Sequence, residues 1–146
     1  MNKKGFTLIE LLVVIAIIGL LSTLAVVALG SAREKARDSK RLADLKNVQA
    51  SLELYFVENN SYPVTTGPIT LGNDQHRCLG SNGFNAAGAC NAPVYMELIP
   101  SEPETNQPGY QYTGSATSYT ITATLEGQIN DLGPGQITVT QNGISG

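Results

Sequence analysis

A continuous apolar stretch near the N-terminus limits what this chain can fold into more than any other feature. It runs from Phe6 to Gly30 and carries a single charge, at Glu10. About 25 residues, at a rise of roughly 1.5 Å each, are enough for a helix to cross a bilayer core about 30 Å thick. The stretch is too long for the apolar part of a signal peptide, and no Ala-x-Ala cleavage site follows it. We therefore expect residues 6–30 to stay with the protein as a membrane anchor.

Glu10 is unexpected in this anchor, because a carboxylate inside a membrane helix is costly unless another group pairs with it. Gly5 precedes the apolar Phe6, and Glu10 follows Phe6 by four positions. This arrangement resembles the prepilin signature of the type IV pilin superfamily. The match is without gaps over residues 5–19, GFTLIELLVVIAIIG. It covers only the N-terminal part of the chain.

The resemblance implies that the chain is processed before it acts. A prepilin peptidase and N-methyltransferase on the cytoplasmic side would cleave after Gly5 and methylate the amine of Phe6, which makes residues 1–5 a leader peptide. Glycine suits a cleavage site because a protease can approach its backbone closely. We expect Lys3 and Lys4 to hold the leader on the cytoplasmic side. The resemblance also implies that identical mature chains polymerise into a filament on an inner-membrane assembly platform.

Cleavage would supply a partner for Glu10. The new ammonium group of Phe6 would lie at a helix N-terminus, where the helix dipole already places partial positive charge. Glu10 follows about one turn later, so its carboxylate can pair with the ammonium of the same chain or of a neighbouring chain in a filament. A buried pair between chains would set their axial register, as a polar residue does in a coiled coil. The alternative is that Glu10 lies near the membrane edge and extends to the interface.

The helix is expected to continue beyond the anchor. Residues 1–62 contain no proline, and apolar residues recur at spacings of three and four, which is typical of an amphipathic helix. These residues are Leu42, Leu45, Val48, Leu52, Tyr55 and Phe56. Residues 31–60 therefore form the amphipathic half of one helix, which begins near Thr7 and ends at Asn59-Asn60-Ser61. This tripeptide is also a glycosylation sequon, but a turn is the favoured interpretation.

Residues 61–146 are expected to form a globular domain, which gives the chain an α+β fold. Residues 61–109 lack a clear period and contain six prolines, so we expect a long loop there. The period then changes to two, which predicts strands at residues 110–113, 119–125 and 137–140. These strands would form a three-strand antiparallel meander on the apolar stripe of the helix. The fold implied by the family resemblance is similar, since it packs a long helix against an antiparallel sheet.

Cys78 and Cys90 are the only cysteines. In a polar segment rich in glycine and asparagine, they indicate a disulfide in an exported domain. The bridge would close a loop of about 13 residues and stabilise the fold by roughly 3 kcal/mol. The alternative is two free buried thiols in a cytosolic domain. His76 lies close to Cys78, but no second histidine or Cys-x-x-Cys pair accompanies it, so a metal site is not expected.

The charges of the chain are unevenly distributed. Residues 33–46 hold six bases and three acids. Residues 47–146 hold one base, Arg77, and eight acids. The basic segment can contact lipid headgroups before assembly, or it can be a solvated helix face. The acidic globular domain argues against a nucleic-acid partner, which needs a basic surface.

The orientation of the anchor rests on two opposing observations. A count of lysine and arginine alone places the C-terminus inside the cell, because the basic segment follows the anchor. The two cysteines and the prepilin resemblance place the globular domain outside. We expect a single-pass protein of the cytoplasmic membrane, with its N-terminus inside, that later enters an extracellular or periplasmic filament.

The sequence does not indicate an enzyme, since it has one histidine, no Gly-x-Ser-x-Gly motif and no phosphate-binding loop. The main hypothesis is a structural subunit of a type IV pilus. The alternative is the major pseudopilin of a type II secretion system, which the helix length and the strands also resemble. A lesser alternative is a membrane-anchored adhesin or a minor pilin for DNA uptake.

A calcium ion is the one cofactor that the resemblance raises. The major pseudopilin of type II secretion carries calcium ligands in its C-terminal loop, and residues 126–133 are the comparable stretch here. Glu126, Asn130 and Asp131 could offer oxygen ligands. Two carboxylates are few for this ion, and asparagine and glycine are also what a turn requires. We therefore expect no cofactor, with calcium as the alternative.

Overall fold

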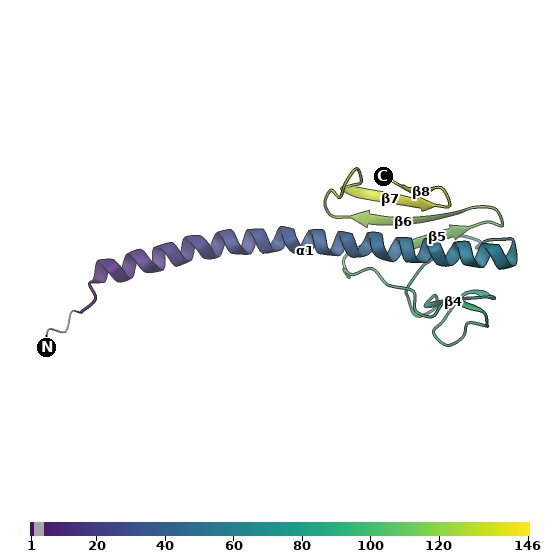
Figure 1. Cartoon of the computed structure of the whole chain (residues 1–146), viewed down its shortest axis with the longest axis horizontal. Coiled ribbons are helices and arrows are strands. Elements are labelled where there is room, and N and C mark those ends of the chain that lie inside the picture. Colours follow the sequence, from purple (N-terminus) through teal and green to yellow (C-terminus); the bar gives the residue numbers. More distant parts are fainter. Residues whose placement is uncertain (2–4) are drawn as a thin grey trace. The chain divides into compact units, whose positions relative to one another are not determined.

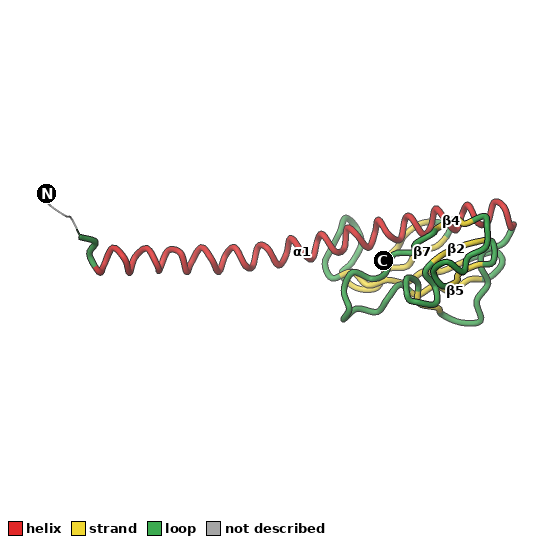
Figure 2. Tube along the Cα trace, turned by 90° about the horizontal axis from the view of Figure 1, so that it is seen from below, coloured by secondary structure: helices red, strands yellow, loops and turns green. Residues whose placement is uncertain are grey.

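A computed structural model describes residue 1 and residues 5–146, so the expected role of Lys3 and Lys4 lies outside the described residues. The chain divides into two compact units, a stem unit (Met1–Glu34) and a head unit (Lys35–Gly146). Helix α1 (Leu8–Asn59) contributes its first half to the stem unit and its second half to the head unit. The prediction of one unbroken helix over this range is confirmed (Figure 2).

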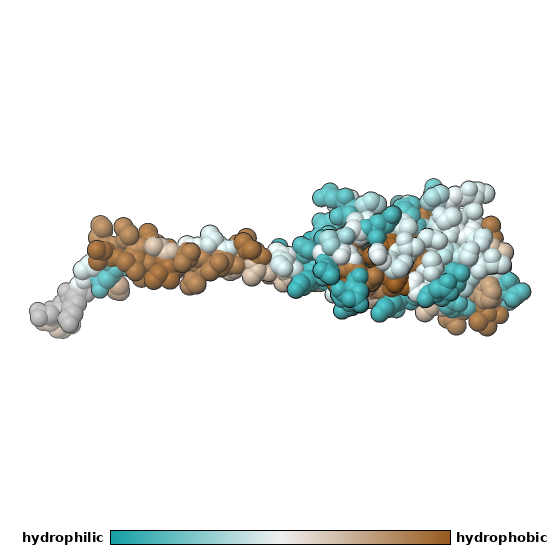
Figure 3. Space-filling view, turned by 90° about the horizontal axis from the view of Figure 1, so that it is seen from above, coloured by the Kyte–Doolittle hydropathy of each residue, from teal (hydrophilic) through white to brown (hydrophobic). Residues whose placement is uncertain are grey.

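The stem unit presents apolar side chains on every side. The apolar residues from Leu8 to Leu29 are exposed, and brown apolar atoms make up most of the stem surface that Figure 3 shows. By length and composition, α1 can cross a membrane, and none of its apolar window is buried within the chain. A helix that is apolar all round needs lipid or other helices as its surroundings.

The second half of α1 buries the predicted apolar stripe in the head unit. Leu45, Val48 and Leu52 are buried, and the other three members of the stripe pack against the same core. The helix ends as predicted: Asn60 has a positive φ of 50°, and its N–H donates to the carbonyl of Phe56 at 2.7 Å. This left-handed residue is a common helix terminator, so the turn predicted there is confirmed.

A five-stranded antiparallel sheet packs on this stripe. Its order is β1-β5-β6-β7-β8. The strands are β1 (Ile69–Thr70), β5 (Gln111–Gly114), β6 (Tyr119–Leu125), β7 (Gly135–Thr140) and β8 (Gly143–Ser145). The predicted meander is confirmed as β5-β6-β7, and the sheet extends beyond it by one short strand at each edge. Along β6 every second side chain is buried, which gives the period of two.

A second sheet occupies the segment that was expected to be a loop. It has the order β3-β2-β4 and consists of β2 (Cys78–Gly80), β3 (Gly83–Asn85) and β4 (Val94–Met96). Figure 1 draws β4 on one side of α1 and β6 to β8 on the other. Strands of three residues are too short to show an alternation in the sequence, which explains why the segment looked irregular.

The disulfide between Cys78 and Cys90 is present, so that prediction is confirmed and the alternative of two free thiols is wrong. The same segment contacts α1 at Tyr95, whose ring meets that of Tyr55 edge to face with centroids 5.4 Å apart. Ile99 is buried in the core, whereas Leu98 is 65% exposed and takes no part in it.

Gly114 lies at a close approach in the core where only glycine fits. A Cβ atom at Gly114 would lie 2.2 Å from the carbonyl oxygen of Pro63 and 2.2 Å from the hydroxyl oxygen of Tyr112. That hydroxyl donates to the Pro63 carbonyl at 2.8 Å, so the buried tyrosine has a polar partner. The contact fixes the chain after α1 against the end of β5.

Two leucines of α1 provide a matched test of this packing. Leu52 is fully buried, whereas Leu54 is 57% exposed. We expect Leu52→Ala to lower the free energy of unfolding of the head unit by about 2–5 kcal/mol, because it leaves a cavity. We expect about 0.5 kcal/mol or less for Leu54→Ala. Urea unfolding of the full chain in detergent, followed by circular dichroism, measures both. Equal losses for the two variants would contradict the described core.

Candidate functional site

The first turn of α1 is closed by a reciprocal pair of side chains, Thr7 and Glu10. The backbone N–H and the hydroxyl of Thr7 donate to Glu10 Oε2 at 2.8 and 2.7 Å. In return, the N–H of Glu10 donates to the Thr7 hydroxyl at 3.3 Å. A threonine before the helix and a glutamate three residues later form a capping box, which satisfies backbone donors that have no partner within the helix.

This pair gives Glu10 a role that sequence reasoning did not assign to it. The carboxylate caps its own helix through one oxygen, Oε2. Among the residues that the structure describes, no hydrogen bond reaches its second oxygen. Thr7 and Glu10 both lie on the C-terminal side of the predicted cleavage site after Gly5, so the capping box does not depend on the leader. The signal was present as Thr-x-x-Glu at residues 7–10.

Gly5 and Phe6 precede the helix and are exposed, Phe6 to 87%. A Cβ atom at Gly5 would meet no other atom of the described chain within 4 Å. The fold of the chain therefore does not require a glycine at this position. A requirement for glycine would have to come from a partner that approaches the backbone there.

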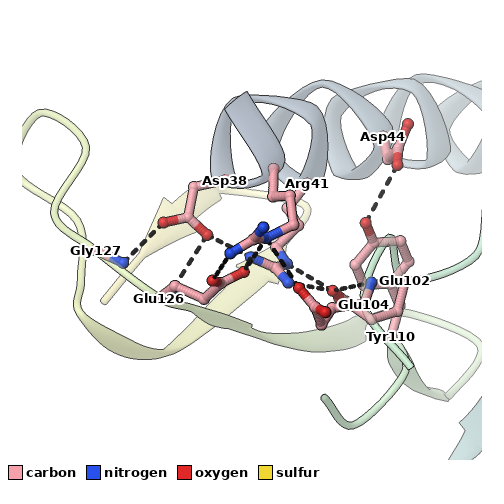
Figure 4. A network of polar contacts seen from close by, with 9 residues as sticks. Asp38, Arg41, Asp44, Glu102, Glu104, Tyr110, Glu126 and Gly127 are labelled. Carbon is pink, nitrogen blue, oxygen red and sulfur yellow. Dashed lines mark hydrogen bonds and ion pairs between the residues drawn. The ribbon is translucent and has the colours of Figure 1, made fainter. Parts of the chain in front are cut away.

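The head unit contains a charged cluster in which Arg41 is the central group (Figure 4). The side chain of Arg41 is 0% exposed. Its Nη1 donates to Asp38 Oδ1 and to Glu126 Oε1, both at 2.6 Å. Its Nε donates to Glu102 Oε1 at 2.7 Å, and its Nη2 contacts the same carboxylate. Three carboxylates from three parts of the chain therefore surround one guanidinium group.

Arg37 and two backbone amides complete the cluster. Arg37 Nε donates to Glu126 Oε1 at 2.8 Å, its Nη2 pairs with Glu126 Oε2, and its Nε lies 3.0 Å from Glu104 Oε2. Asp38 accepts the backbone N–H of Glu126 at 3.0 Å and that of Gly127 at 2.8 Å. The turn after β6 is thus tied to α1 through both side chains and backbone.

The cluster changes the acidity of its members. Hydrogen bonds from Arg37, and then from Arg41, lower the pKa of Glu126 from 4.5 to about 2, although burial opposes this shift. Burial by itself lowers the pKa of Arg41, but hydrogen bonds to three carboxylates outweigh it and the pKa is raised. Burial raises the pKa of Asp44, which accepts the Tyr110 hydroxyl at 3.2 Å.

Sequence reasoning missed this cluster. From the sequence, the basic segment 33–46 was interpreted as a solvated helix face or as a contact with lipid headgroups. Neither interpretation fits Arg41, which is buried. The spacing of Asp38 and Arg41, three residues apart on a helix, was a visible signal. Their partners at Glu102 and Glu126 were not visible, since these lie 61 and 85 residues away from Arg41.

The three calcium candidates take different places. Glu126 lies in the charged cluster, with both carboxylate oxygens bound by arginine. Asn130 adopts a positive φ of 54° in the turn, and its carbonyl accepts from Gln128 at 3.4 Å. Asp131 is exposed. Within the described part of the chain, no three histidine, cysteine, aspartate or glutamate side chains gather as a metal site requires.

The low pKa of Glu126 predicts an acid sensitivity. Its carboxylate contributes its full stabilisation above about pH 4.5, and that contribution is lost as the pH falls towards 2. Asp44 has the opposite sign, because its raised pKa favours folding at low pH. Asp44 is present in both the wild type and Glu126→Gln, so its contribution cancels when the two are compared. The free energy of unfolding of the wild type should exceed that of Glu126→Gln by less and less as the pH falls from about 4.5 towards 2. A difference that stays constant with pH would refute the ion pairing.

The chain is similar to known proteins in its N-terminal segment and along most of its length. Residues 1–30 match the family model of the prokaryotic N-terminal methylation motif. The chain is 41% identical over 103 residues to type II secretion system core protein G of Aeromonas hydrophila, which is 70% of this chain and 68% of that protein. It is 30% identical over 122 residues to core protein G of Pseudomonas aeruginosa, covering 80% and 77% of the two chains.

A relative from a pilus is also similar. The type IV wide pilus major component PilA4 of Thermus thermophilus is 48% identical over 61 residues, which is 42% of this chain and 47% of that protein. This chain also matches core protein G of Pectobacterium carotovorum and of Escherichia coli, but it spans only 41% and 44% of the length of these two proteins. No solved structure matches this chain.

Proposed function

This chain belongs to the superfamily of type IV pilins and type II secretion pseudopilins, and we propose that it is a structural subunit that polymerises into a filament. In this proposal it is cleaved after Gly5, N-methylated at Phe6 and assembled into a type IV pilus. The observation that carries the proposal is an entirely exposed apolar stem behind a complete processing motif. Such a stem needs lipid first and neighbouring stems afterwards.

The alternative is the major pseudopilin of a type II secretion system, and one observation favours it. The similarity to core protein G from Aeromonas and Pseudomonas extends over most of this chain, whereas the similarity to PilA4 covers 42% of it. Electron microscopy of sheared cell-surface filaments, followed by peptide identification, separates the two. Long surface filaments that contain this chain support a pilus, and their absence from expressing cells supports a pseudopilus.

The geometry suggests how Glu10 serves both the single chain and the filament. One oxygen caps the helix through Thr7, and the second is available to the ammonium group of Phe6 after cleavage. A charged hydrogen bond in an apolar surrounding is stronger than one in water. The pair would therefore be strongest where stems pack together and exclude solvent. The capping box holds the carboxylate in place before that partner arrives.

The remaining parts of the proposal concern location and partners. The stem would lie in the cytoplasmic membrane with its N-terminus inside, and the disulfide-bonded head unit would lie outside. The partners would be lipid, a prepilin peptidase and N-methyltransferase, an assembly platform and identical subunits. We propose no catalytic role.

Two substitutions of Glu10 separate capping from charge pairing. Glutamine can replace glutamate in a capping box but carries no charge, whereas alanine removes both functions. We expect Glu10→Gln and Glu10→Ala to be processed and inserted in the membrane normally, and both to lose filament assembly. Immunoblots of sheared filaments and of membranes measure the two stages. Normal assembly of Glu10→Gln together with failure of Glu10→Ala would show that capping alone is needed.

Gly5 tests the processing step. A Cβ atom at this position would meet no atom of the described chain within 4 Å, so we expect a side chain there to leave folding unaffected. We expect Gly5→Leu to remain uncleaved because a side chain blocks the approach of the peptidase, and Gly5→Ala to be cleaved more slowly. The uncleaved chain runs higher on a gel, and mass spectrometry reports the methyl group on Phe6. Complete cleavage of Gly5→Leu would contradict the proposed site.

A further inference from the structure

We propose that the arginine pair Arg37 and Arg41 holds the head unit together in the place of a divalent cation, so that the head unit folds without calcium. The inference rests on the head unit alone and does not depend on the proposal that the chain forms a filament. It concerns the turn after β6, the stretch in which the family resemblance raised a calcium site.

The donors of this turn do not fit a calcium ion. Calcium takes six to eight oxygen ligands, several of them carboxylates. The two oxygens of Glu126 are already bound by Arg37 and Arg41. Asp131 is exposed on the turn, and the three carboxylates that do gather, at Asp38, Glu102 and Glu126, enclose the guanidinium group of Arg41. A divalent cation at Glu126 would also face two guanidinium groups at close range, which repel it.

The guanidinium groups already supply what a bound cation would supply in this turn. A calcium ion joins distant carboxylates by its charge. Arg41 joins Asp38 on α1, Glu102 before β5 and Glu126 after β6 in the same manner. Asp38 in turn binds the backbone amides of Glu126 and Gly127. The cation is part of the helix and therefore cannot be removed by dilution or by a chelator.

Arg41 is buried together with two of its carboxylate partners, so these carboxylates depend on its positive charge. The side chain is 0% exposed, and Glu102 and Asp38 are 6% and 1% exposed. Removing one partner of a buried charged group leaves the others without compensation, which is strongly destabilising. One oxygen of Glu102 has no hydrogen-bond partner among the described residues even with Arg41 present. Without Arg41, three carboxylates would lie together in the interior.

The test uses the full chain in detergent, unassembled, so that failure of filament assembly leaves the measurement unaffected. Thermal unfolding of the wild type is followed by circular dichroism with added calcium chloride and with excess EGTA, and calorimetric titration with calcium measures binding. We expect the same melting temperature with calcium and with EGTA, and no heat of calcium binding in the titration. A melting temperature raised by calcium or lowered by EGTA would overturn the proposal.

Two arginine variants test the positive half of the proposal. We expect Arg41→Met to lower the melting temperature, because it keeps the apolar stem of the side chain and removes the cation. The matched control is Arg33→Met, an exposed arginine on the same helix, which should leave the melting temperature unchanged. A melting temperature of Arg41→Met equal to that of the wild type would refute the role of the cation. If Arg41→Met does not fold, Arg37→Met replaces it, because Arg37 is the partly exposed member of the pair. A lowered melting temperature of Arg37→Met supports the proposal, and an unchanged one refutes it.

Discussion

The exposed apolar surface of the stem is the constraint on which the rest of this molecule depends. From Leu8 to Leu29 the side chains find no cover within the described chain, and water is a poor surrounding for so much apolar area. The same helix must then enter a head unit that is folded in water. Helix α1 meets both demands by changing its pattern, from apolar on all sides to apolar along one stripe.

Each half of α1 carries charge at a position where charge is costly, and Glu10 and Arg41 are the main examples. Glu10 lies in the apolar stem and is held by the Thr7 capping box. Arg41 lies in the interior of the head unit and is held by three carboxylates. The partners of Arg41 are all present in the folded chain. Among the residues that the structure describes, no hydrogen bond reaches the second oxygen of Glu10, so this oxygen can accept a bond from another molecule.

Several features could be predicted because their cause is local in the sequence. The apolar stretch, the stripe from Leu42 to Phe56 and the turn at Asn60 follow from composition and spacing over a few residues. The alternation along β6 was equally plain. The strands β1 to β4 could not be predicted, because two or three residues are too few for a period and their pairing depends on distant neighbours.

The sequence by itself determined the processing motif, the single long helix, the central meander and the presence of two cysteines able to pair. Each of these rests on residues that are adjacent or regularly spaced. The tertiary structure alone decided the environment of each charge. Arg41 belongs to a segment that looked like a solvated basic face, and Glu126 belongs to a turn that looked like a weak calcium loop. Folding brings them within 2.6 Å of each other across 85 residues of chain. The energy of a charge depends on its partners and its burial, which spacing in a sequence does not specify.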